Sequence, residues 1–380
     1  MKRRFAAAIA MAAALCGVLG CASKPEPQTL PLPSPAPSTV APEPLPPLRR
    51  PDLYAYITDD ELKVREGAHL LVTVPGTFTA ASDLGFTTDH EFVYWREAQP
   101  DGTTTLAAVR LDRPDETIRI ACGACGTILP STGARLVWHG ADAETITRVD
   151  LFSPERRPEE WRTLPPGMRP GRPPGGIGRT TVWLLASRGD RLLLSRTFAD
   201  YPARTVTNDL FTIEQDGSTR NYGRLAGVNG FTQRAMFNPD GTQAVVFADP
   251  SGGADSNPCV RTTAALLDLA AGTYRTTAPK VDDCAIPTRI RWQRDELTIT
   301  LDTWRGGGTT QQVERTTRWQ YRDQNWSPEP DPNLIDRDRT RAGNTVELTS
   351  KTHQGPFYLY FHTSREITLW ANNVHAFAIG

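Results

Sequence analysis

The sequence has almost no excess of charge of either sign. Its 42 Lys and Arg residues face 43 Asp and Glu, which gives a formal net charge of -1. Neutralising the phosphates of a nucleic acid needs a basic excess, so we expect no DNA or RNA partner. Long apolar runs are also missing, because beyond the N-terminal segment nothing reaches the roughly 20 apolar residues that span a bilayer. The rest of the chain is therefore expected to lie outside the membrane.

Known catalytic motifs are absent. The sequence contains no G-x-S-x-G elbow, P-loop, H-E-x-x-H or G-x-G-x-x-G. Its six histidines are scattered, without a close pair that could complete a zinc site. Asp249 and Asp255 share a loop, but their spacing matches no calcium-binding loop. The sequence therefore predicts no catalytic residue, no metal ligand and no cofactor.

The strongest signal lies in the first 21 residues. Lys2, Arg3 and Arg4 precede a short apolar run that ends in Val18-Leu19-Gly20-Cys21, which is the layout of a secretory signal peptide. The Leu-Gly-Cys ending resembles the lipobox of bacterial lipoproteins. This resemblance implies cleavage after residue 20 and a diacylglyceryl group on Cys21, whereas a conventional cleavage would leave Cys21 an ordinary residue. Acyl chains gain about 0.8 kcal/mol per buried CH₂, so two or three chains hold a protein at the membrane.

The expected location follows from that ending. We predict a signal peptide over residues 1–20 and a lipid-anchored protein on the extracytoplasmic face of the cell membrane, or on the outer membrane in a Gram-negative host. Residues 21–51 then carry the lipidated cysteine and a run rich in Pro, Ser, Ala, Thr and Glu. Such a segment cannot bury a core and is predicted to be a disordered, semi-rigid linker of about 3.1 Å per residue.

Four further cysteines remain: Cys122, Cys125, Cys259 and Cys284. An even number in an oxidising compartment suggests two disulfides, and local closure favours Cys122–Cys125 and Cys259–Cys284. The second would close a loop of about 25 residues, worth roughly 3 kcal/mol. Cys122-Gly-Ala-Cys125 follows a strand-like segment, whereas a redox C-x-x-C normally lies at a helix N-terminus. We interpret it as a structural disulfide, with a redox pair and half of a zinc site as the alternatives.

Short alternating runs rich in Val, Leu, Thr, Trp and Tyr predict strands from residue 52 to the end. One unit of paired strands recurs. Its clearest copy has a first hairpin over 237–247 that turns at Asp240-Gly241, and a second over 264–277 that turns at Ala271-Gly272. Weaker copies cover 88–112, 131–151, 187–217, 293–321 and 341–361. Their spacing of roughly 45 to 55 residues is the length of a four-stranded blade.

One copy carries a specific motif. Phe237–Gln243 reads F-N-P-D-G-T-Q, and Val245-Val-Phe247 follows it, which resembles the F-S-P-D-G repeat of TolB-type β-propellers. The resemblance implies an all-β propeller domain over residues 52–380. We favour seven blades over six, because Leu53–Val64 looks like the outer hairpin of a blade whose inner hairpin can come from the C-terminal end, Glu366–Ile379. Joining both termini in one blade removes exposed sheet edges. The competing fold is two β-sandwich domains divided near Pro165–Gly178.

Two classes of function follow. The first is a monomeric, non-enzymatic envelope lipoprotein whose propeller binds another protein or a cell-wall component, and TolB-like propellers are similar in role. The second is an extracytoplasmic carbohydrate-active enzyme that uses the mouth of the propeller channel. Three or more charged side chains converging at that mouth would favour the enzyme, and an apolar or aromatic rim would favour binding. The loop Asp249–Pro258 is a candidate ligand contact, and most tryptophans are expected to pack between blades.

Overall fold

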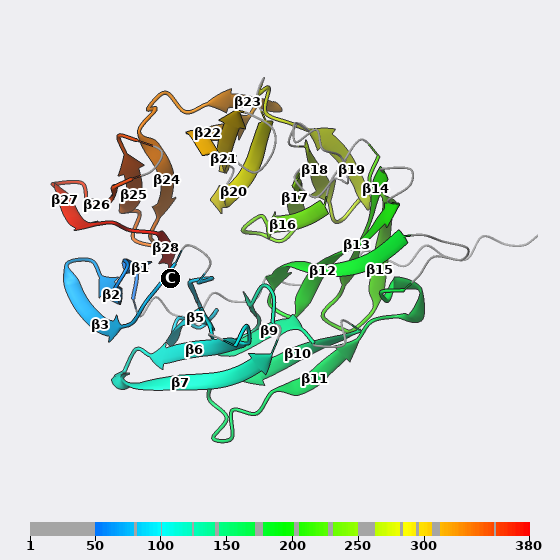
Figure 1. Cartoon of the computed structure of the whole chain (residues 1–380), viewed down its shortest axis with the longest axis horizontal. Helices are drawn as coiled ribbons and strands as arrows, with labels where there is room; N and C mark the ends of the chain where they lie inside the picture. Colours follow the sequence, from blue (N-terminus) through cyan, green and yellow to red (C-terminus); the bar gives the residue numbers. More distant parts are fainter. Residues whose placement is uncertain are drawn as a thin grey trace, which may run out of the picture. The chain divides into compact units, whose positions relative to one another are not determined.

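The computed structural model describes residues 50–380 apart from 80–81, 100, 124, 141–143, 172–177, 201–204, 227–230, 250–262, 282–283, 294–295, 306–311 and 353–354. Within these residues, seven antiparallel sheets of four strands are arranged in a ring (Figure 1). This confirms the predicted β-propeller and its seven blades, and it excludes the two-sandwich alternative. The signal peptide, Cys21 and almost all of the linker lie outside the described residues.

Each blade is described from its innermost strand to its outermost. Blade 1 holds β28 (Ala376–Ile379), β1 (Leu53–Ile57), β2 (Glu61–Glu66) and β3 (His69–Pro75). Blade 2 holds β4 (Gly85–Phe86), β5 (Phe92–Ala98), β6 (Thr104–Arg110) and β7 (Arg113–Gly123). Blade 3 holds β8 (Leu129–Pro130), β9 (Arg135–His139), β10 (Thr145–Asp150) and β11 (Glu159–Thr163). A short 3₁₀ helix, η1 (Pro166–Met168), follows blade 3.

The remaining four blades follow η1 along the chain. Blade 4 holds β12 (Gly178–Arg188), β13 (Arg191–Asp200), β14 (Thr205–Ile213) and β15 (Thr219–Arg224). Blade 5 holds β16 (Phe231–Phe237), β17 (Gln243–Asp249), β18 (Thr263–Asp268) and β19 (Thr273–Thr277). Blade 6 holds β20 (Cys284–Gln293), β21 (Glu296–Arg305), β22 (Gln312–Arg322) and β23 (Asn325–Pro328). Blade 7 holds β24 (Leu334–Arg339), β25 (Thr345–Ser350), β26 (Phe357–His362) and β27 (Ile367–Asn372).

Both termini join in blade 1, as predicted, but the division of strands differs from the prediction. The N-terminal part supplies three strands, and the C-terminal part supplies only β28, which pairs with β1 through Tyr54↔Ile379 and Ala55↔Ala378. Ile367–Asn372, expected to belong to this blade, is instead the outermost strand of blade 7. The physical reason is that β26 already offers Ile367–Asn372 an adjacent edge, reached by a short turn.

The F-N-P-D-G segment forms the turn between β16 and β17. Asn238 Oδ1 accepts a hydrogen bond from Gln243 N at 2.8 Å, and Asp240 Oδ1 accepts one from Thr242 N at 2.8 Å. Gly241 has a φ of +75°, a conformation that side-chain-bearing residues rarely adopt. The motif is therefore a turn signal, because each of its polar residues satisfies backbone groups of the loop.

The core lies between blades. Six hydrophobic clusters of described residues occupy the interfaces 1–2, 2–3, 3–4, 4–5, 5–6 and 7–1. In the described part of the chain no such cluster joins blades 6 and 7. Thr298, Thr300 and Arg318 of blade 6 are buried there instead, together with Asp336 and Asp338 of blade 7. One interface of the ring is thus held by polar and charged groups.

Candidate functional site

The ring has two faces with different connections. Turns between the first and second strands and between the third and fourth strands form what we call the turn face. Connections between the second and third strands and between blades form the loop face. The chain enters the ring on the turn face at Asp52, whose carbonyl accepts a hydrogen bond from Gly67 N. It ends there as well, since Gly380 N donates to Leu53 O at 2.9 Å.

Charged side chains converge on three innermost strands next to the closure. Arg291 of β20 donates to Asp336 of β24 through Nη2, at 2.9 Å, and also to the carbonyl of Phe377 in β28. Its Nη1 lies 3.3 Å from Asp338 Oδ2. Arg289 lies 3.7 Å from Asp336 and donates to the carbonyl of His375. This inner charge cluster (Arg289, Arg291, Asp336 and Asp338) links blades 6, 7 and 1.

The pKa values of the two carboxyl groups in the cluster are shifted in opposite directions. Asp336 is 1% exposed; burial alone would raise its pKa, but Arg291 and Arg289 together hold it below its usual value. Burial raises the pKa of Asp338 to about 6, against the attraction of Arg291. The cluster therefore holds one firmly ionised carboxylate and one that takes up a proton near pH 6.

A second group of ion pairs continues the same interface outward. Arg318 Nη1 of β22 lies 2.7 Å from Glu329 Oε2, and both side chains are at most 10% exposed. Arg337 of β24 lies 2.6 Å from Glu347 Oε1 and 3.8 Å from Glu329 Oε1. Oppositely charged groups thus pair across blades 6 and 7, which is what buried charges require.

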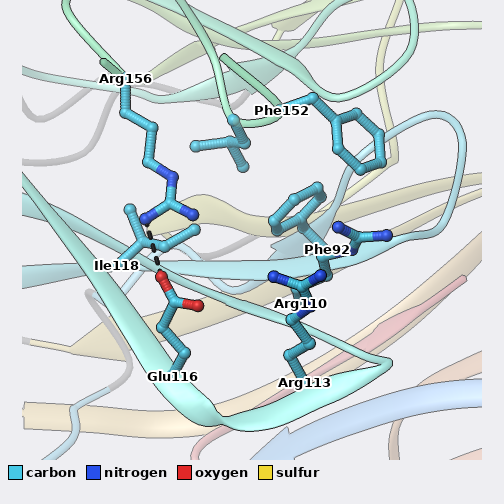
Figure 2. A pocket seen from close by; sticks show the side chains of 8 residues that line it. Phe92, Arg110, Arg113, Glu116, Ile118, Phe152 and Arg156 are labelled. Atoms are coloured by element: carbon cyan, nitrogen blue, oxygen red, sulfur yellow. Dashed lines mark hydrogen bonds and ion pairs between the residues drawn. The ribbon is translucent and has the colours of Figure 1, made fainter. Parts of the chain in front are cut away.

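A separate cavity of about 120 Å³ opens between blades 2 and 3. We call it the rim cavity, and Figure 2 shows it from close by. Arg110 ends β6 and Arg113 begins β7, while Phe152 and Arg156 belong to the connection between β10 and β11. These are turns between third and fourth strands, so the cavity lies on the turn face. The other lining residues are Phe92, Glu116, Ile118 and Leu151.

The lining of the rim cavity combines arginines with aromatic rings. Arg156 Nη1 lies 2.9 Å from Glu116 Oε1 (Figure 2). The guanidinium of Arg110 lies 4.8 Å from the centroid of the Phe152 ring, which meets Phe92 edge-on at 5.1 Å. Three guanidinium groups against one lining carboxylate give the cavity a positive charge, although Asp112 offsets Arg110 at 2.7 Å.

The predicted cysteine sites have different outcomes. Cys122, in β7, and Cys125 form a disulfide, and Cys125 is buried in the cluster between blades 2 and 3. Cys259 and the loop 250–258 lie outside the described residues, as does the side chain of Cys284, so the pairing Cys259–Cys284 stays a prediction. Cys122, Cys125 and Cys284 do not meet in one site, since they lie at blades 2 and 6.

Most of the tryptophans pack between blades, as predicted. Trp95 and Trp138 are buried in the clusters of interfaces 1–2 and 2–3. Trp183, Trp292, Trp319, Trp326 and Trp370 pack against other inter-blade clusters.

Neither the inner charge cluster nor the rim cavity is among the sites predicted from the sequence. The sequence nevertheless contains a pattern that corresponds to each of them. Charged residues alternate in Arg289-Ile-Arg291 and run through Asp336-Arg-Asp-Arg339, in segments that the predicted units did not include. For the cavity, the third strands of consecutive units are each followed by a turn containing Arg and Pro, 111–114 and 151–158. Equivalent turns of adjacent blades are neighbours in a propeller, which would have brought these arginines together.

Comparison with known proteins found similarity to solved structures at low sequence identity. No family model matches the sequence, and no curated protein sequence matches it. The chain is similar to a protein from Lactobacillus plantarum, with 12% identity, a TM-score of 0.50, and coverage of 85% of this chain and 96% of that chain. It is also similar to the β-propeller domain of the Trilobed protease from Pyrococcus furiosus, with 11% identity, a TM-score of 0.49, and coverage of 83% and 97%.

TolB from Acinetobacter baumannii is a further similar structure, with 13% identity and a TM-score of 0.42 over 74% of this chain and 64% of that chain. At these identities the similarity concerns the fold. Its seven four-stranded sheets make the chain a seven-bladed β-propeller. Among the described residues, no helix is long and apolar enough to cross a membrane.

Proposed function

We propose that this protein is a lipid-anchored binding scaffold of the cell envelope, whose propeller binds another protein or a cell-wall component without catalysing a reaction. The rim cavity carries this proposal. It is a small, positively charged site with aromatic walls on the edge of a closed ring. Such a combination of arginine and aromatic side chains is typical of residues that dominate binding interfaces.

The anchor in this proposal depends on the sequence around Cys21. Mass spectrometry of the membrane-extracted protein should show an acylated N-terminal cysteine. Cys21→Ser should release the protein from the membrane, because the thiol that carries the lipid is lost. Normal membrane retention of Cys21→Ser would overturn the anchor.

The binding role is tested by photo-crosslinking in intact cells. A crosslinking amino acid at Phe152, which is 47% exposed beside the cavity, should capture a discrete partner. The matched control carries it at Lys351, an exposed residue after β25 on the loop face. Capture from position 152 but not from 351 supports the proposal. Equal products from both positions, or none from either, would contradict it.

The carbohydrate-active alternative has one observation in its favour. Four charged side chains converge on the innermost strands, and the two carboxyl groups among them have separated pKa values, as an acid and a base need. The same geometry argues against catalysis, because Asp336 is 1% exposed and accepts hydrogen bonds from Arg291 through both oxygens. Hydrolysis of envelope polysaccharide by the purified protein, abolished in Asp338→Asn, would establish the enzyme.

A further inference from the structure

The rim cavity has more donor groups than its own carboxylates use. Arg156 is paired with Glu116, and Arg110 with Asp112. Arg113 has no hydrogen-bond or ion-pair partner in the described part of the chain. The Nε atom of Arg156 is buried and, again among the described residues, has no hydrogen-bond partner. Buried donors are normally satisfied, so the Nε of Arg156 has capacity for a ligand. Arg113 is exposed, and its guanidinium donors are free for the same anion.

The backbone conformation of Arg156 also indicates a ligand site at the rim cavity. Arg156 has a φ of +46°, a left-handed conformation that costs free energy in a residue with a Cβ and that is concentrated at functional sites. In this conformation its guanidinium reaches the cavity from blade 3, while that of Arg113 reaches it from blade 2 (Figure 2). An anion between them would bridge two blades.

From these observations we infer that the rim cavity binds a carboxylate of a peptide that carries an aromatic or apolar side chain next to it. The planar guanidinium groups match a carboxylate through paired hydrogen bonds. Phe152 is half exposed at the opening of the cavity, and its ring can pack against the aromatic or apolar side chain of the peptide. This inference rests on the proposed binding function and specifies its ligand.

Binding is measured by calorimetry on the detergent-solubilised full chain with three short peptides. N-acetyl-Phe-Asp-amide offers a side-chain carboxylate, N-acetyl-Ala-Phe with a free C-terminus offers a terminal one, and N-acetyl-Phe-Asn-amide is the neutral match. At least one acidic peptide should bind, and the neutral peptide should bind at least about tenfold more weakly, because a hydrogen bond between charged groups is lost. Which acid binds more tightly identifies the source of the carboxylate.

Arg113→Gln should weaken the acidic peptide by about tenfold or more. The control is Arg119→Gln on the same strand, whose side chain is 55% exposed and pairs with Glu97 outside the cavity lining; it should leave affinity unchanged. Equal binding of acidic and neutral peptides, or an unchanged Kd in Arg113→Gln, would overturn the inference. Displacement by inorganic phosphate at the peptide's own Kd would overturn the specificity for a peptide.

The two proposals fail separately. If crosslinking at position 152 captures a partner in cells and Arg113→Gln does not reduce that capture, the binding function stands and the carboxylate site is wrong. If acidic peptides bind in solution but no partner is captured in cells, the site stands and the scaffold function is wrong.

Discussion

Replacing Asp336 with Asn tests whether ion pairs hold blades 6 and 7 together. Asp336 is 1% exposed and accepts from Arg291 at 2.9 Å, with Arg289 at 3.7 Å. Removing one partner of a buried pair leaves the other charge uncompensated, which typically costs 3–5 kcal/mol. Asp338 remains 3.3 Å from Arg291, so we expect the lower end, about 3 kcal/mol. Asn retains the acceptor for the Arg337 backbone N–H, which limits the change to the charge.

The assay is chemical denaturation followed by tryptophan fluorescence, with the midpoint and slope compared between variants. A double-mutant cycle with Arg291→Met isolates the pair. The double variant should lose less stability than the two single variants added together, because the charges of Asp336 and Arg291 are removed together and neither is left buried without the other. It should not return to the wild type, since Arg291 also donates to the carbonyl of Phe377 and lies 4.8 Å from its ring.

The exposed pair of Arg119 and Glu97 provides the control. Arg119 is 55% exposed, and surface pairs are worth at most about 1 kcal/mol. Arg119→Gln should therefore shift the midpoint little. A loss of under about 1 kcal/mol in Asp336→Asn, or strict additivity in the cycle, would refute the view that charge pairing stabilises this interface.

Two further predictions concern single positions. Asp338 binds its proton up to about pH 6 in the folded protein but loses it near 3.8 when unfolded, so stability should fall by about 2 kcal/mol as the pH rises from 4 to 6. Asp338→Asn should remove that slope in urea denaturation across pH, and an identical slope would exclude Asp338 as its source. Gly241→Ala should destabilise more than Gly102→Ala in the same assay: both glycines have positive φ, but a Cβ at Gly241 would meet Arg188, whereas one at Gly102 meets nothing within 4 Å. Equal losses would show that backbone strain alone decides the cost.

Much of the fold could be predicted from the sequence because its signals are local. The turn at Asp240-Gly241 and the alternating strands around it are determined by residues a few positions apart. Six repeated units and the terminal hairpin Leu53–Val64 then predicted seven blades. The division of blade 1 could not be predicted in the same way, because β28 pairs with β1 across more than 300 residues and has only four residues of its own.

The candidate sites were harder to predict, since both depend on contacts between blades. Arg113 and Arg156 are far apart along the chain and meet because their turns occupy equivalent places in neighbouring sheets. The inner charge cluster depends on innermost strands, which the sequence units did not include. Its four charged residues lie on β20 and β24 of different blades, and only the contact between these blades shows that they neutralise each other.

The position of the inner charge cluster gives it a role that an apolar core could not fill. Replacing a buried ion pair with well-packed apolar residues is often neutral or stabilising, so stability alone does not explain why one interface lacks a hydrophobic cluster. Arg289 donates to the carbonyl of His375, just before β28, and Arg291 donates to the carbonyl of Phe377 within β28. Apolar contacts tolerate sliding, whereas these bonds have one register, and a slip of one residue would turn the side chains of β28 to opposite faces of the blade. We therefore interpret the charges of blades 6 and 7 as the groups that select the register in which the last strand closes the ring.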